Sequence, residues 1–109
     1  MQLNLLSAYA GGIYVGQRQQ FVYSAIGPAS YSQTNGDVVS LPTGVYLDEI
    51  RSAIDTTGTY MVVFVPSTTN TTRATWTARW YTLAGMTQVA NATNLSAIAV
   101  QFGAQGGEF

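Results

Sequence analysis

The sequence contains no cysteine, no histidine and no lysine, and only 8% of its 109 residues are charged. Without cysteine the chain has neither a disulfide framework nor a thiolate metal site. Without histidine it lacks the commonest metal ligand and the commonest general base. These absences argue against catalysis, so we expect a protein that is not an enzyme and that binds no metal and no cofactor.

Charge is scarce as well, since an average soluble domain is about 25% charged. The formal net charge is -1, so no basic field is present to attract nucleic acid. No apolar run approaches the roughly 18 residues needed to span a membrane, and the N-terminus lacks the positive start of a secretion signal. We therefore expect neither a nucleic acid nor a membrane as partner. A surface this poor in charge suits a protein packed against its own copies or a large partner.

Short β-prone segments, separated by turn signals, fill most of the chain. Five of them are expected to be strands, namely 21–26, 37–41, 59–65, 73–83 and 95–102. The segment 59–65 (TYMVVFV) is apolar on both faces, so we interpret it as a central strand of a two-layer structure. The pattern predicts a mainly β protein, a small antiparallel β-sandwich or barrel.

One segment has the spacing of a helix rather than of a strand. Its apolar residues are Tyr46, Leu47, Ile50 and Ile54. The acids Asp48 and Glu49 would lie in the first turns, where they favour the helix dipole. We predict one short helix over residues 45–54. Adjacent carboxylates on a helix do not face each other, so this pair is no glycosidase site.

Trp76 and Trp80 lie four residues apart, on the same face of the strand predicted over 73–83. If that face is exposed, the two rings could form a platform on which a sugar stacks. If it is buried, with Ala74 and Ala78 beside the rings, they anchor the core. We favour the core, because alternating large and small side chains fill a tapered interior well.

Residues 1–20 differ from the rest, because Gly11, Gly12 and Gly16 interrupt any regular element. We interpret them as an extended N-terminal arm ordered by contact with another subunit, and a frayed terminus is the alternative. A single β-rich domain is expected over residues 21–109, with a tail (GAQGGEF) that is flexible by composition. The candidate partner-binding residues belong to the arm and to the end of the tail: Leu5, Leu6, Tyr9, Ile13, Tyr14, Arg18 and Phe109.

Four segments carry a resemblance to a known class of proteins. They are GPASYSQTNGDVVSLP (27–42), YLDEIRSAIDTTGTYMVVFVPS (46–67), RATWTARWY (73–81) and VANATNLSA (89–97). Together with the Gly-rich aromatic end, they resemble small virion structural proteins of tailed bacteriophages, of the capsid decoration or cement type. The resemblance covers residues 27–109, and none of its segments is a catalytic signature.

The resemblance implies a β-rich fold, a homo-oligomer, expected to be a trimer on local threefold positions, and binding to the major capsid protein on the outer surface of the capsid. A cement protein stabilises the shell by mass action, because it binds the assembled shell and not its separated parts. Two other functions stay open. One is a tail, neck or fibre component of the same virion; the other is a carbohydrate-binding β-domain that uses Trp76, Trp80 and tyrosines.

Overall fold

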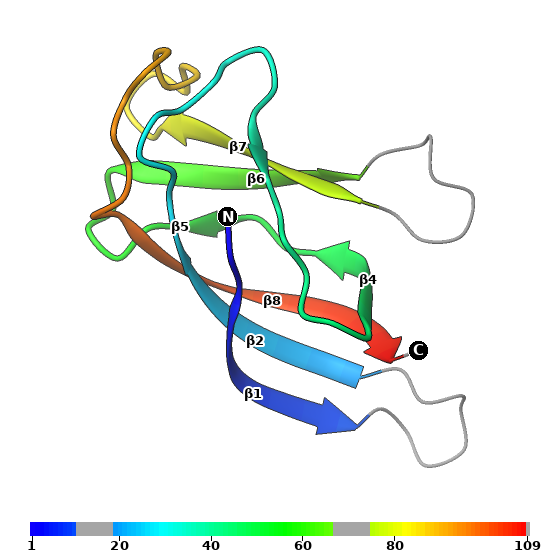
Figure 1. The fold of residues 1–109 in the computed structure, drawn as a ribbon. Helices are drawn as coiled ribbons and strands as arrows, with labels where there is room; N and C mark the ends of the chain where they lie inside the picture. The colour runs from blue at the N-terminus through cyan, green and yellow to red at the C-terminus, as the bar shows by residue number, and fades with distance from the viewer. Residues whose placement is uncertain (11–18, 67–74, 109) are drawn as a thin grey trace.

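The computed structural model describes residues 1–10, 19–66 and 75–108 (Figure 1). Within these ranges all the regular secondary structure is β-strand. The strands are β1 (Asn4–Ala10), β2 (Gln19–Ile26), β3 (Asp37–Val38), β4 (Val45–Ile50), β5 (Ala53–Ile54), β6 (Tyr60–Pro66), β7 (Trp76–Thr82) and β8 (Ala99–Glu108). The predicted mainly β, antiparallel architecture is confirmed.

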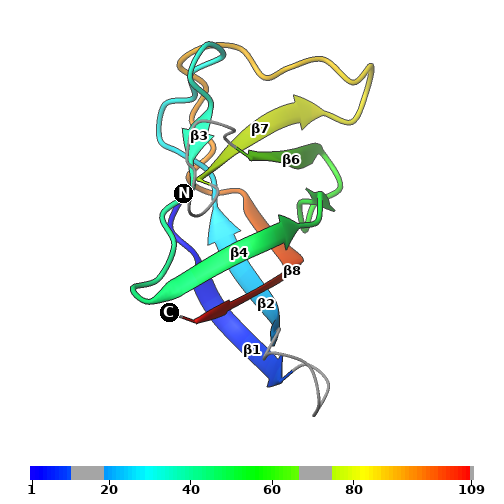
Figure 2. The ribbon, with the colours of Figure 1, turned by 90° about the vertical axis from the view of Figure 1, so that its right-hand side faces the viewer.

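The strands form two antiparallel four-stranded sheets (Figure 2). Sheet 1 has the order β1-β2-β8-β4, and its centre is the pairing of β2 with β8 from Gln19↔Gly106 to Ile26↔Ala99. Sheet 2 has the order β3-β7-β6-β5, in which β6 and β7 pair along seven residues. A bridge between Asp55 and Val100 joins the two sheets at one corner.

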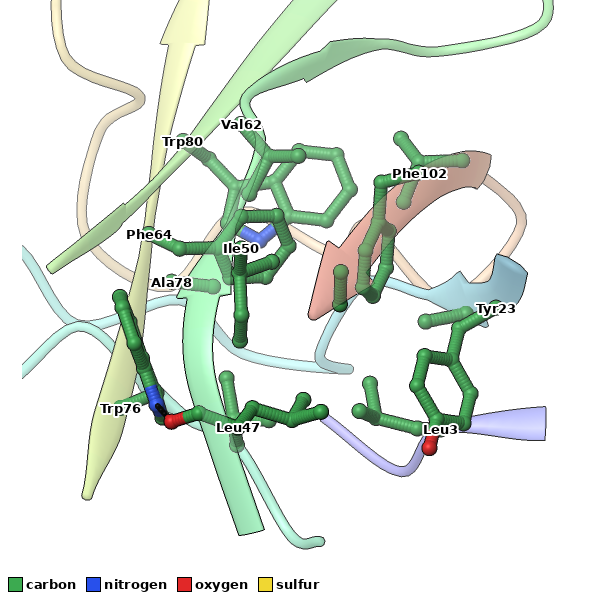
Figure 3. Close-up of a cluster of buried hydrophobic side chains, with 14 of the residues drawn as sticks. Leu3, Tyr23, Leu47, Ile50, Val62, Phe64, Trp76, Ala78, Trp80 and Phe102 are labelled. Atoms are coloured by element: carbon green, nitrogen blue, oxygen red, sulfur yellow. Dashed lines mark hydrogen bonds between the residues drawn. The ribbon is translucent and has the colours of Figure 1, made fainter. Parts of the chain in front are cut away.

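The core lies between the sheets and is built from the inward-facing residues of both (Figure 3). Phe64 of sheet 2 meets Phe102 of sheet 1 with ring centroids 4.6 Å apart. Trp80 is fully buried, and Trp76 is 5% exposed and donates its indole N–H to the Leu47 carbonyl at 3.0 Å. Both tryptophans therefore anchor the core, as the large-small alternation predicted.

The predicted helix over residues 45–54 is wrong: this segment forms β4 and β5. A β-bulge between Leu47 and Glu49 shifts the register of β4 against β8. The extra residue allows Leu47 and Ile50 both to point into the core, whereas Asp48 and Glu49 are exposed. A bulge in a half-buried strand thus reproduces the three-residue apolar spacing of a helix.

Two predictions about the chain ends also differ from the structure. Residues 4–10 were expected to be part of an extended arm, but they pair as β1 with β2 of their own sheet, and Leu3 is buried. The Gly-rich tail was expected to be flexible, but residues up to Glu108 continue β8 between β2 and β4. Glycine is required at Gly106, because a Cβ there would lie 1.9 Å from the Tyr46 carbonyl oxygen.

Candidate interaction surfaces

Two of the five acids serve the fold itself. Asp37 is 6% exposed, and one of its oxygens accepts a hydrogen bond from the α-ammonium group of Met1 at 2.7 Å. Its other oxygen accepts a longer hydrogen bond from the Trp80 indole N–H at 3.4 Å. Asp55 is 4% exposed and organises the turn between β5 and β6. Neither carboxylate is open to a substrate. Within the described ranges, no group of three or more acids, histidines or cysteines could hold a metal ion.

Asp55 binds the turn that follows it through both of its oxygens. One oxygen accepts the backbone N–H groups of Thr59 and Tyr60, at 2.8 and 2.7 Å. The other accepts the backbone N–H of Thr57 at 3.0 Å and the Thr57 hydroxyl. Burial raises the pKa of Asp55, but the hydrogen bonds to the ionised form outweigh it and hold the pKa below its ordinary value.

We expect Asp55→Asn to lower the free energy of unfolding by about 2–4 kcal/mol. The amide replaces one accepting oxygen with an NH₂ group, which is itself a donor and cannot accept from the backbone N–H groups of the turn. The folded-state pKa is lowered, so the stabilisation is fully present above the unfolded pKa of about 3.9 and is lost as the pH falls through the folded pKa. Urea denaturation at neutral and acidic pH measures both effects. The variant should lose stability less steeply in acid than the parent. As a control, the exposed Glu49→Gln, which removes only a surface ion pair with Arg51, should change the stability at neutral pH by less than about 1 kcal/mol.

The structure brings two of the predicted partner-binding residues together on β1. Leu5 is 54% exposed and Leu6 is 51% exposed, and a bulge between Leu5 and Ser7 lets these adjacent leucines both reach solvent. Tyr9 lies on the same strand, opposite Gln20, and its side chain is outside the description. The remaining candidates lie outside the described residues: Ile13, Tyr14, Arg18 and Phe109.

We call Asn4–Ala10 the β1 edge, because β1 pairs with β2 on one side and ends sheet 1 on the other. An open edge presents backbone N–H and C=O groups that can pair with another strand. Proteins commonly block such an edge with a charged residue or a proline. The sequence of this edge, NLLSAYA, contains neither. The bulge between Leu5 and Ser7 is the one feature of this edge that hinders pairing with a further strand. The edge therefore remains suited to contact with another chain.

The sequence analysis missed a second exposed apolar surface, on the side of sheet 2 away from the core. We call it the outer face of sheet 2. Cross-strand pairing places its residues in rows: Ile54 beside Met61 and Tyr81, then Val63 beside Arg79, then Val65 beside Thr77 and Val38. Val38, Ile54 and Val65 are exposed, and the others are half-buried. Arg79 is the only charged residue in these rows.

A signal for this face was present in the sequence. The segment 59–65 is apolar on both faces, which predicts a central strand of a two-layer structure. In the structure β6 is indeed internal to its sheet, between β7 and β5. Its Val62 and Phe64 face the core, but Met61, Val63 and Val65 face outward. The second apolar face of this strand thus lacks the covering layer that its composition indicates.

The outer face of sheet 1 mixes polar and apolar residues, because Val22 and the exposed Ile26 lie there beside polar rows. Gln20 pairs with Gln105, and Ser24 pairs with Gln101 across β2 and β8. A shallow pocket of about 100 Å³ lies there, beside Gly103 and the exposed Arg51. Small-molecule sites usually have about 300–1,000 Å³, so this pocket is too small to be a ligand site.

Two further findings bear on possible partners. The tryptophan platform of the carbohydrate-binding alternative is absent, because Trp76 and Trp80 are both buried. In the part of the chain that the structure describes, no helix is long and apolar enough to cross a membrane.

No protein-family model, no curated protein and no solved structure matches this chain.

Proposed function

We propose that this chain is a non-enzymatic structural protein of a tailed-bacteriophage virion, a small β-sandwich that decorates the outer surface of the capsid. It binds the major capsid protein, associates with its own copies and bridges neighbouring capsid subunits. The observation that carries this proposal is the pair of exposed apolar surfaces, the β1 edge and the outer face of sheet 2. A bridging protein needs two separate contact surfaces, and this charge-poor chain has them on different sheets.

We assign the capsid contact to the β1 edge. An extended segment of the capsid protein would add a strand to sheet 1 beside β1, so that backbone hydrogen bonds hold it. Leu5 and Leu6 would supply the apolar contact beside this pairing. Because the edge carries no charge, the affinity should depend only weakly on salt.

Particles that lack the protein should release their DNA at a lower temperature than complete particles, because a capsid subunit bound to a bridge must break two contacts before it leaves. A dye-release melting assay measures this. Adding back the purified protein should restore the melting temperature of the particles. Adding back the Leu5→Lys/Leu6→Lys double variant should not, since it places two charges in the apolar contact.

The control for the double variant is Ile26→Lys, at a residue that is 53% exposed and lies on β2 beyond the residues that pair with β1. It should restore the melting temperature as well as the parent protein does. If bare particles are as robust as complete ones, the protein is not a cement.

The second candidate function is a tail, neck or fibre component of the same virion. The same two apolar surfaces favour it, because they suit permanent assembly at any position in the particle. Electron cryo-microscopy of intact particles distinguishes the two, since density only in the tail would replace the capsid proposal with this one.

A further inference from the structure

We propose that Asn35-Gly36 is a site of spontaneous covalent modification in this protein, and that Arg79 sets the rate by holding the turn around this pair closed. The modification is deamidation, in which the Asn35 side chain loses ammonia and becomes a carboxylate. It requires only the chain itself and water, so it does not depend on the proposed function. The observations that carry it are the conformation of Gly36, the hydrogen bonds of the turn and the two contacts of Arg79.

The reaction begins when the Gly36 backbone nitrogen attacks the side-chain carbonyl carbon of Asn35. A bond forms between this nitrogen and Cγ, the bond from Cγ to Nδ2 breaks, and the Gly36 amide proton leaves with the amide group as ammonia. Water then opens the resulting succinimide ring. Opening at Cγ restores the Gly36 N–H and leaves an aspartate. Opening at the backbone carbonyl carbon of Asn35 leaves an isoaspartate, in which the main chain runs through the former side chain.

The fold requires at residue 36 the residue type that makes this reaction fast. A side chain there would hinder the approach of the nitrogen to Asn35, and glycine has none. Gly36 has a φ of +70°, and a Cβ on it would lie 2.4 Å from Thr77 Cγ2 and 3.1 Å from the Ala78 carbonyl oxygen. Asn35 is exposed, so water reaches the ring that forms. The close packing of Gly36 on β7 therefore keeps a reactive Asn-Gly pair at the surface.

Ser32 restrains both reacting residues in the closed turn. The Gly36 N–H donates to the Ser32 carbonyl oxygen at 2.8 Å, and the Asn35 N–H donates to the Ser32 hydroxyl at 3.1 Å. The Gly36 nitrogen attacks only after it gives up its proton, and this hydrogen bond keeps the proton in place. Modification therefore requires the turn to open, and its rate follows the fraction of molecules in which the turn is open.

Arg79 fastens this turn to sheet 2. Its guanidinium donates to the carbonyl oxygens of Gln33 and Thr34, the two residues directly before Asn35. Hydrogen bonds from a charged donor are stronger than neutral ones, and Arg79 lies half-buried on β7, which pairs along its whole length with β6 (Figure 2). Gln33 has further partners, so the bond to Thr34 is the contact of Arg79 that most directly restrains Asn35.

Peptide mapping by mass spectrometry measures the reaction in the purified full-length protein at mildly alkaline pH. The folded parent should modify Asn35 at least about tenfold more slowly than the parent unfolded in urea. Arg79→Met removes the guanidinium and keeps an unbranched stem, and it should raise the rate in the folded protein at least about fivefold. The matched control is Arg51→Met, at an exposed arginine directly after β4, and it should leave the rate unchanged.

Two measurements separate a local effect of Arg79 from a loss of global stability. Trp76→Phe should lower the free energy of unfolding too, but it leaves the turn in place and should keep the slow rate. Hydrogen exchange followed by NMR is the second measurement, since Arg79→Met should speed the exchange of the Gly36 N–H more than that of the backbone N–H groups of β6. Ser32→Ala removes the hydroxyl that accepts from Asn35 and should also raise the rate, so it serves if Arg79→Met does not fold.

Three results would overturn the inference. If Asn35 stays unmodified even in urea, it is not a modification site. If the folded parent reacts as fast as the unfolded parent, the turn gives no protection. If the rate stays slow in Arg79→Met and in Ser32→Ala, these residues do not hold the turn closed. The capsid proposal is unaffected by each of these results, because the dye-release assay measures it separately.

Discussion

Gly106→Ala is expected to destabilise the protein by about 3 kcal/mol or more, or to prevent folding. Gly106 lies on β8 opposite Leu47 of β4. A Cβ at this position would lie 1.9 Å from the Tyr46 carbonyl oxygen and 2.8 Å from the Leu47 Cα. Both are backbone atoms, so no side-chain rotation can relieve the overlap. The variant must move β4 away from β8 and give up their pairing.

The matched control is Gly103→Ala, the same substitution on the same strand. A Cβ at Gly103 would meet only the flexible end of Arg51, no closer than 3.8 Å. We expect a change between zero and a gain of about 1 kcal/mol, because alanine reduces the freedom of the unfolded chain. Urea denaturation followed by circular dichroism measures both variants. Equal stabilities for the two would contradict the close approach of β4 at Gly106.

Trp76→Ala is expected to lower the free energy of unfolding by about 3–5 kcal/mol, the range found for large aromatic residues in cores. The Trp76 ring fills the space between β7 and β4 and its N–H binds the Leu47 carbonyl, so it joins the two sheets (Figure 3). The alanine variant loses the packing and the hydrogen bond together.

Trp76→Phe separates the two contributions. It keeps most of the ring volume but leaves the Leu47 carbonyl without its indole donor, which should cost about 1–3 kcal/mol. Thr77→Ala, at the next residue and on the outer face, is the control and should change the stability by less than about 0.5 kcal/mol. Urea denaturation again gives the values. If Trp76→Ala is as stable as the parent, Trp76 does not belong to the core.

The burial of the tryptophans and the positions of the turns could be predicted, because both depend on sequence signals that are local. The alternation from Trp76 to Trp80 needs only the two-residue period of a strand. An Asn-Gly pair such as Asn35-Gly36 favours a turn with positive φ, and Gly36 has a φ of +70°. The prediction over residues 45–54 failed for a reason that is not local. The bulge in β4 exists because β4 pairs with β8, about 60 residues away, and the spacing of Leu47 and Ile50 does not reveal that partner.

The candidate surfaces divide in the same way. Leu5 and Leu6 could be chosen as contact residues because they belong to an apolar segment near glycines. The sequence does not show that this segment is an edge strand, because that position depends on the pairing of β1 with β2. The outer face of sheet 2 could not be assembled from the sequence, because its rows join residues from four strands.

The sequence by itself determined the β architecture and the absence of histidine, cysteine and lysine chemistry, because strand propensity and side-chain chemistry belong to single residues and their near neighbours. Only the tertiary structure decided which apolar faces are covered. The two faces of 59–65 are almost equally apolar, yet one packs on Phe102 and the other meets solvent. Burial depends on what other segments place above a face, and that is a property of the whole fold.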